Sequence, residues 1–140
     1  MAEGVFLHLA EQKGLTEFYE VASAGTAGYH IGERPDSRMI DTAEGHGVVL
    51  PSLARQLDTS DFDAFDFIIA MDSDNLDNIN QLKPDGQSRA TIFKMRDFDD
   101  VDPNGDVPDP YYGGLKGFEN VFQMLKRCNE KFIVHLESNR

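Results

Sequence analysis

The sequence of 140 residues contains one cysteine, no tryptophan, and only 13 lysines and arginines against 25 aspartates and glutamates. A single cysteine excludes an internal disulfide framework and is compatible with a reducing compartment. The formal charge of −12 argues against nucleic acid or an anionic membrane as a partner, because binding to phosphates needs Lys and Arg. The chain has no apolar run of roughly twenty residues and no basic-then-apolar leader, so we expect a cytoplasmic protein.

The sequence otherwise has the composition of an ordinary globular protein, with 40% hydrophobic and 27% charged residues. We expect residues 1–140 to form one domain, because there are no repeats, low-complexity tracts or linkers. Apolar segments predict strands over residues 17–23, 65–71 and 90–95, the second of them covered on both faces. Apolar periodicity, caps and breakers predict the helices, which cover residues 2–13, 36–45, 51–57, 72–82 and 118–136.

Strands that alternate with helices predict right-handed crossovers and a parallel sheet, hence an α/β fold. Ligands of such sheets bind outside the carboxyl ends of the strands. We expect the loops that leave those ends, residues 23–29, 72–75 and 96–114, to converge there. The third loop contains "DVPDPYYGG", in which Asp109 stands between two prolines that fix φ and stiffen the chain. The sequence therefore predicts a carboxylate aimed into the crevice.

Four segments resemble the low molecular weight protein tyrosine phosphatases. They are "SAGTAGYHIGERPDSR" (23–38), "LARQL" (53–57), "DFDAFDFIIAMDSDNL" (61–76) and "VPDPYYGG" (107–114), in the order and spacing of the family. The resemblance covers essentially the whole chain and implies a doubly wound, four-stranded parallel sheet. It also implies that the full-length form hydrolyses phosphotyrosine proteins or small aryl phosphates through a cysteinyl phosphate, with no cofactor and no metal.

The resemblance assigns one catalytic residue among these 140. Asp109 matches the general acid that protonates the leaving phenolate and then the base that activates water, a role typically worth about 10²–10⁴ in rate. The remaining implied site residues bind the substrate or support the phosphate loop. They are Tyr29, Tyr111 and Tyr112 at the substrate ring, and Ser23 and Asp72 behind the phosphate loop.

The nucleophilic Cys-x5-Arg loop of the family has no counterpart in this sequence. In the family a strand and this loop, about twenty residues, precede a helix that opens much like residues 1–6. Cys128 lies on the apolar face of the last predicted helix, which indicates an inert core thiol. We therefore expect a truncated, inactive chain whose sheet lacks or replaces its first central strand, and which forms homo-oligomers through exposed strand edges.

Two further interpretations stay open. A non-catalytic pseudophosphatase that binds a partner would also keep Asp109 and Tyr111 without a nucleophile. Alternatively, "DVDPNGD" (100–106) matches the opening of a calcium loop, although the twelfth position is Tyr111 rather than glutamate. The oxygen ligands of that loop would be Asp100, Asp102, Asn104 and Asp106.

Overall fold

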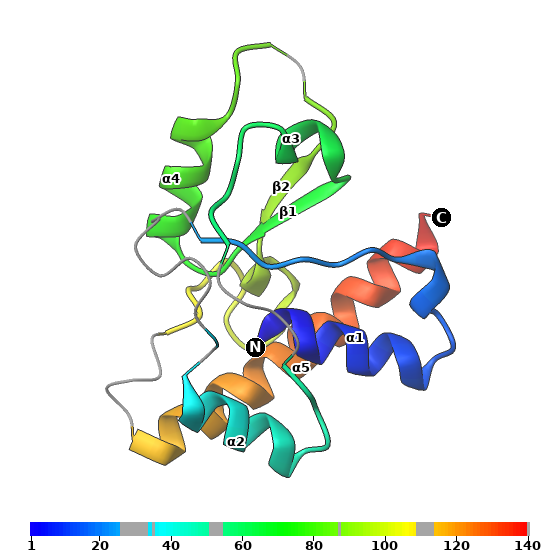
Figure 1. The fold of residues 1–140 in the computed structure, drawn as a ribbon, viewed down its shortest axis with the longest axis vertical. Coiled ribbons are helices and arrows are strands. Elements are labelled where there is room, and N and C mark those ends of the chain that lie inside the picture. Colours follow the sequence, from blue (N-terminus) through cyan, green and yellow to red (C-terminus); the bar gives the residue numbers. More distant parts are fainter. Residues whose placement is uncertain (26–33, 35, 51–54, 87, 109–113, 140) are drawn as a thin grey trace.

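A computed structural model describes the chain except residues 26–33, 35, 51–54, 87, 109–113 and 140 (Figure 1). Helices and strands alternate along the described residues. In chain order they are α1 (Ala2–Gln12), the 3₁₀ helix η1 (Thr16–Phe18), α2 (Ser37–Gly45), α3 (Asp61–Ala64), β1 (Phe67–Ala70), α4 (Ser73–Leu82), β2 (Thr91–Lys94), the 3₁₀ helix η2 (Met95–Phe98) and α5 (Gly114–Ser138).

The two strands form a parallel pair with helices on both faces. Phe67 lies opposite Thr91, and the register continues to Ala70 opposite Lys94. Successive side chains of a strand point to opposite faces. Accordingly, Phe67 and Ile69 pack into the core shared with α1 and α5, whereas Ala70 packs with Phe62 of α3 and Ile79 of α4. The predicted α/β, doubly wound fold with a parallel sheet is confirmed.

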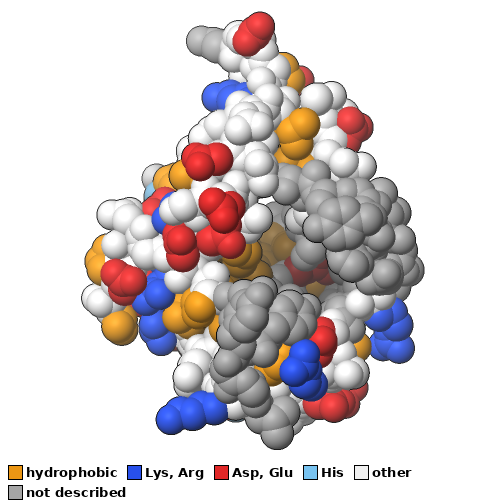
Figure 2. Space-filling view, turned by 90° about the vertical axis from the view of Figure 1, so that its left-hand side faces the viewer, with side chains coloured by type: hydrophobic (Ala, Val, Ile, Leu, Met, Phe, Trp, Pro, Cys, Tyr) orange, Lys and Arg blue, Asp and Glu red, His pale blue; other side chains and the backbone are white. Residues whose placement is uncertain are grey.

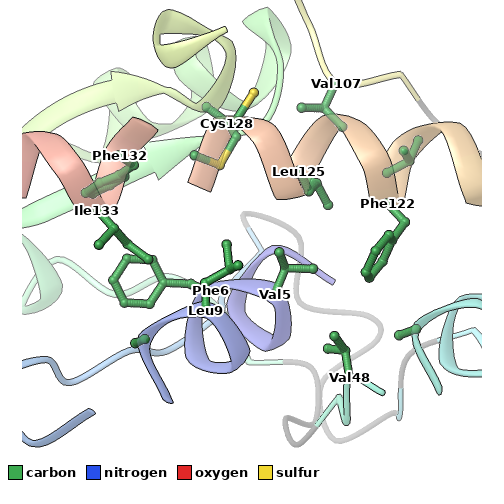
Figure 3. Close-up of a cluster of buried hydrophobic side chains, with 14 of the residues drawn as sticks. Val5, Phe6, Leu9, Val48, Val107, Phe122, Leu125, Cys128, Phe132 and Ile133 are labelled. Carbon is green, nitrogen blue, oxygen red and sulfur yellow. The ribbon is translucent and has the colours of Figure 1, made fainter. Parts of the chain in front are cut away.

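The larger core lies between α1, α2 and α5 (Figure 1). Figure 3 shows the apolar side chains of α1 and α5 pointing toward one another, with Val48 and Val107 at the edges of the cluster. Gly4 lets α1 approach residues 48–50 closely, because a Cβ there would lie 2.6 Å from Leu50 Cδ2. The predicted apolar stripe of the last helix is buried along its length; its members are Phe118, Val121, Phe122, Leu125, Cys128, Phe132 and Leu136.

Local signals set the ends of two helices as predicted. α1 ends in a Schellman motif: Gly14 has φ +69°, Leu15 N–H donates to Ala10 O at 2.8 Å, and Gly14 N–H donates to Glu11 O at 3.1 Å. α4 begins with Asp72 as N-cap, whose carboxylate accepts from Asn75 N–H at 2.7 Å. None of the helices in the described part of the chain is long and apolar enough to span a membrane.

Two predictions of local structure are wrong. The strand expected over 17–23 begins as the 3₁₀ helix Thr16–Phe18, and the described residues up to 24 belong to no strand. Gly25 alone forms a parallel bridge, with Gln56. The second error is the helix expected over 51–57. Residues 51–54 lie outside the described ones, and residues 55–57 are not helical but contain Gln56 of this bridge. A β-prone segment becomes a strand only beside a paired neighbouring strand, and local composition does not show whether the fold supplies one.

Candidate functional site at the carboxyl ends of the strands

Two of the three loops predicted to converge meet at the carboxyl end of β1. Val107 N–H, in the loop before Asp109, donates to Met71 O at 2.8 Å. Its neighbour Asp106 accepts from Ser73 at the start of α4, from the backbone N–H at 3.1 Å and from the hydroxyl at 2.9 Å. The end of the long loop is thus attached where parallel sheets bind their ligands.

A lysine at the end of β2 joins the same contact. Lys94 Nζ lies 2.7 Å from Asp106 Oδ1 and donates to Ser73 Oγ at 3.0 Å and to Asn104 O at 2.9 Å. Hydrogen bonds from Lys94, and then from Ser73, lower the pKa of Asp106 below its usual value. Lys94 was not among the predicted site residues, because its position at the end of a strand does not show which carboxylate it meets.

The earlier part of the loop is held by a buried aspartate between two arginines. The side chain of Asp99 is fully buried, and Arg96 Nε donates to it at 2.9 Å. Arg127 of α5 binds the same carboxylate through Nε at 2.9 Å and Nη2 at 3.1 Å. The hydrogen bonds from Arg127, and to a smaller extent the one from Arg96, hold the pKa of Asp99 far below its usual value. Burial by itself would raise this pKa. Asp99 therefore links the loop to α5 as a charged group.

Comparison with known proteins places this arrangement in a family. The family model "Low molecular weight phosphotyrosine protein phosphatase" matches residues 1–140. The chain belongs to the low molecular weight phosphotyrosine protein phosphatase family. The protein of that name from Schizosaccharomyces pombe is 42% identical over 134 residues, which are 95% of this chain and 85% of that protein. The human protein is 36% identical over 135 residues, 95% of this chain and 84% of its own length.

Solved structures of this phosphatase family have the same fold. A protein tyrosine phosphatase from Entamoeba histolytica, crystallised with Hepes in its active site, superimposes with a TM-score of 0.92. It is 41% identical, and the match covers 99% of this chain and 88% of the crystallised one. The resemblance inferred from four segments of the sequence is confirmed.

The phosphatase residues assigned from the sequence fall into two groups. Ser23 and Asp72 are described: Ser23 is exposed, and Asp72 is half-buried with one carboxylate oxygen engaged as the N-cap of α4. The other assigned residues lie outside the described ones; these are Asp109, Tyr29, Tyr111 and Tyr112.

In the described part of the acidic loop, the carboxylates suggested as calcium ligands lie beside protein cations. Asp106 pairs with Lys94, Asp100 with Lys131 at 3.1 Å, and Asp102 Oδ2 lies 3.5 Å from Arg96 Nη1. Among the described residues, no three His, Cys, Asp or Glu side chains come together as a metal would require. The carboxylates proposed as calcium ligands are neutralised by protein cations instead.

Cys128 is a core residue of the phosphatase fold rather than a nucleophile. It is completely buried on α5, and desolvation by that burial raises the pKa of its thiol to about 11. A thiol with this pKa carries almost no thiolate at neutral pH, and the thiolate is the reactive form. The predicted core position of Cys128 is confirmed, and its raised pKa is consistent with an unreactive thiol.

Electrostatics of the molecular surface bear on how a phosphatase receives its anionic substrate. Figure 2 shows the face that carries α4, where acidic side chains gather in the upper part. Asp74 and Asp77 of α4 are among the exposed acids. Phosphate binding beside such a surface needs cations or backbone N–H groups close to the phosphate itself, because the surrounding field repels anions.

Proposed function

We propose that Asp109 is the proton donor in hydrolysis of aryl phosphate monoesters by this phosphatase. The supporting observation is the attachment of the loop to β1, two residues earlier, by the 2.8 Å hydrogen bond between Val107 N–H and Met71 O. A carboxyl group two residues beyond this bond, between two prolines, would be expected near the strand ends, where parallel sheets bind their ligands.

The proposed reaction transfers the phosphoryl group from the aryl oxygen to a cysteine thiolate. The P–O bond breaks while the P–S bond forms, and the Asp109 carboxyl gives its proton to the departing phenolate oxygen. Water then attacks phosphorus, the Asp109 carboxylate accepts a proton from it, and the P–S bond breaks to release inorganic phosphate and the thiolate. One carboxyl group thus acts as acid and then as base.

The proposed substrate is the phosphotyrosine side chain of a protein, or a small aryl phosphate. Tyr29, Tyr111 and Tyr112 would hold the phenyl ring, because aromatic faces pack favourably against one another. Ser23 and Asp72 would support the phosphate loop. Asp72 already caps α4 through Oδ1, which leaves Oδ2 for that second role.

We also propose that the 140-residue polypeptide does not by itself form the cysteinyl phosphate. Its one cysteine, Cys128, is buried in α5 with a raised pKa, and no Cys-x5-Arg motif occurs in the sequence. A pseudophosphatase module, which would bind a phosphorylated partner in the cleft without hydrolysis, fits the same observation and is the second candidate.

Hydrolysis of phenyl phosphate by this chain tests these proposals, beside Asp109→Ala and the exposed-acid control Asp85→Ala. We expect no turnover above the buffer blank in any of the three proteins. Turnover that only Asp109→Ala abolishes would overturn the inactivity and support the acid. Turnover above the blank that is equal in all three proteins would overturn both the inactivity and the role of Asp109. Binding of a phosphotyrosine peptide without hydrolysis would favour the pseudophosphatase.

Self-association is a further part of the proposal. Within the described residues, β1 has β2 as its one strand neighbour, so its other edge carries unpaired backbone groups. Such an edge is a template for a strand of another chain. Light scattering at two protein concentrations should show a dimer or a larger species. A monomer at both, with a cooperative thermal transition, would contradict this proposal.

We retain two broader expectations as proposals. A free, buried thiol is compatible with the reducing cytoplasm as the location. Limited proteolysis that yields no stable fragment shorter than residues 1–140 would support a single domain.

A further inference from the structure

The last part of the loop before Asp109 is attached to the sheet by charged and hydroxyl groups. Lys94 ends β2 and shares a sheet face with Ile92, which packs toward α3 and α4. Its side chain is only 12% exposed, which is unusual for lysine. An ammonium group this buried needs partners for its three N–H donors.

All three donors of Lys94 have partners, and they come from the two segments that follow the strands. Nζ lies 3.0 Å from Ser73 Oγ, 2.9 Å from Asn104 O and 2.7 Å from Asp106 Oδ1. The first belongs to α4, directly after β1, and the others belong to the loop that leads to Asp109. Lys94 thus joins three parts of the chain at one point.

Asp106 completes the contact from the side of the loop. Its Oδ1 accepts from the Ser73 hydroxyl and N–H, at 2.9 and 3.1 Å, as well as from Lys94. Its backbone carbonyl accepts from Arg96 Nη1 at 3.0 Å. Val107, the next residue, is buried in the main core and bonded to Met71. The backbone at 106 and 107 therefore has little freedom while these contacts persist.

We propose that Lys94, Ser73 and Asp106 form an electrostatic clamp that positions Asp109. This inference rests on the proposed function, because the clamp would supply the positioning that Asp109 needs as a proton donor. Asp106 precedes Asp109 by three residues, and Pro108 stiffens the chain between them. We therefore expect a shift at 106 to displace Asp109 as well. Proton donors must lie within hydrogen-bond reach of the leaving oxygen, so displacement by one ångström matters.

The clamp is separable from the fold. The bonds of Asp99 to its two arginines anchor the start of the loop without Lys94, Ser73 or the Asp106 carboxylate, and the Asp106 side chain is 51% exposed. Lys94→Met keeps the apolar stem of the side chain and removes the ammonium group with its charge and its three N–H donors. We therefore expect this variant to fold, with the loosening confined to residues near 104–108.

Amide hydrogen exchange and NMR spectra of the 140-residue protein test the clamp. In Lys94→Met and in Asp106→Asn, exchange of the Val107 amide should accelerate by about tenfold or more, because its bond to Met71 opens more often. The backbone amide signal of Asp109 should shift or broaden in the same variants, while the thermal midpoint changes little. Neither measurement requires turnover, so failure of the catalytic proposal and failure of the clamp are distinguishable.

Two controls make the outcome decisive. Lys131→Met removes an exposed ion pair from the same loop, with Asp100, and should leave both readouts within about twofold of the wild type. The double variant Lys94→Met/Asp106→Asn should exchange no faster than about twice the rate of either single variant, because partners in one contact are not additive. Equal effects of Lys94→Met and Lys131→Met, or an unchanged Asp109 signal when Val107 exchange accelerates, would overturn the proposal.

Discussion

The helical side of the sheet and the loop at the strand ends are held together by different forces. Between α1 and α5 the contacts are mainly apolar, and Phe6, Leu9 and Phe132 are nearly inaccessible. In the loop that leads to Asp109, the attachments are ion pairs and hydrogen bonds to Arg96, Arg127 and Lys94. Apolar packing tolerates changes of pH but not loss of volume, whereas the loop should respond to the loss of a single charge. Substitutions that remove either apolar contacts or charged contacts should therefore have different effects on stability.

The largest loss of stability should come from the apolar side. Phe132 touches Phe6, Phe67 and Phe98, with ring centroids 4.9–5.9 Å away, and so connects α1, the sheet and η2 through α5. Phe132→Ala should lower the free energy of unfolding by about 3–5 kcal/mol, measured by urea denaturation. Val134→Ala, on the exposed face of the same helix, should change it by less than about 0.5 kcal/mol. Similar losses of unfolding free energy in Phe132→Ala and Val134→Ala would contradict the conclusion that buried apolar contacts hold α1, α5 and the sheet together.

The next largest effect should come from the buried charge. Asp99→Asn retains the shape of the side chain but leaves Arg96 and Arg127 without their anion, and should cost about 2–3 kcal/mol. Asp100→Asn, in an exposed pair with Lys131, should cost about 0–1 kcal/mol. Denaturation of the two variants under the same conditions compares them. Equal costs would mean that burial does not distinguish these carboxylates.

The pH dependence of stability should differ between wild type and Asp99→Asn. The pKa of Asp99 is lowered in the folded state, chiefly by hydrogen bonds from Arg127, so its contribution is fully present above the unfolded pKa of about 3.9. The contribution is lost as the pH falls below that value toward the folded pKa. The difference in thermal midpoint between the two proteins should therefore shrink at acidic pH and stay constant from about pH 6 to 8. A difference that persists unchanged in acid would contradict the assignment.

The smallest effect should come from a local cap. Asp72→Ala removes the acceptor for Asn75 N–H at the start of α4 and should lower the free energy of unfolding by about 1 kcal/mol. Asp72→Asn keeps an acceptor oxygen and should retain most of that stability. Thermal melts of the three proteins give the comparison. Loss of stability in Asp72→Asn equal to that in Asp72→Ala would indicate that the charge, rather than the cap, matters at this position.

Much of the architecture was predictable because its signals are local. The apolar runs around Phe67 and Ile92 predicted both strands, and Gly14 and Asp72 predicted helix ends, since φ preferences and capping depend on a few neighbouring residues. The stripe of α5 predicted its buried face. Four short segments were enough to indicate the family. The extent and type of these elements therefore followed from the chain alone.

The errors lie where the outcome depends on a distant partner. Residues 17–23 have the composition of a strand but begin as η1 and continue with no strand assignment up to residue 24, because a strand requires a neighbour that local sequence does not supply. Arg96 and Lys94 gave no clear signal, since the meaning of a charged residue depends on which carboxylate the fold brings beside it.

The sequence by itself determined the family, the α/β alternation and the presence of an acid between prolines, because these depend on residue type and spacing. Only the tertiary structure decided that Asp106 pairs with Lys94, and that Asp99 is buried between Arg96 and Arg127. It also decided that the loop before Asp109 is attached at the strand ends. The physical reason is that desolvation and Coulomb interactions act over a few ångströms in space, between residues that lie up to tens of positions apart in the chain.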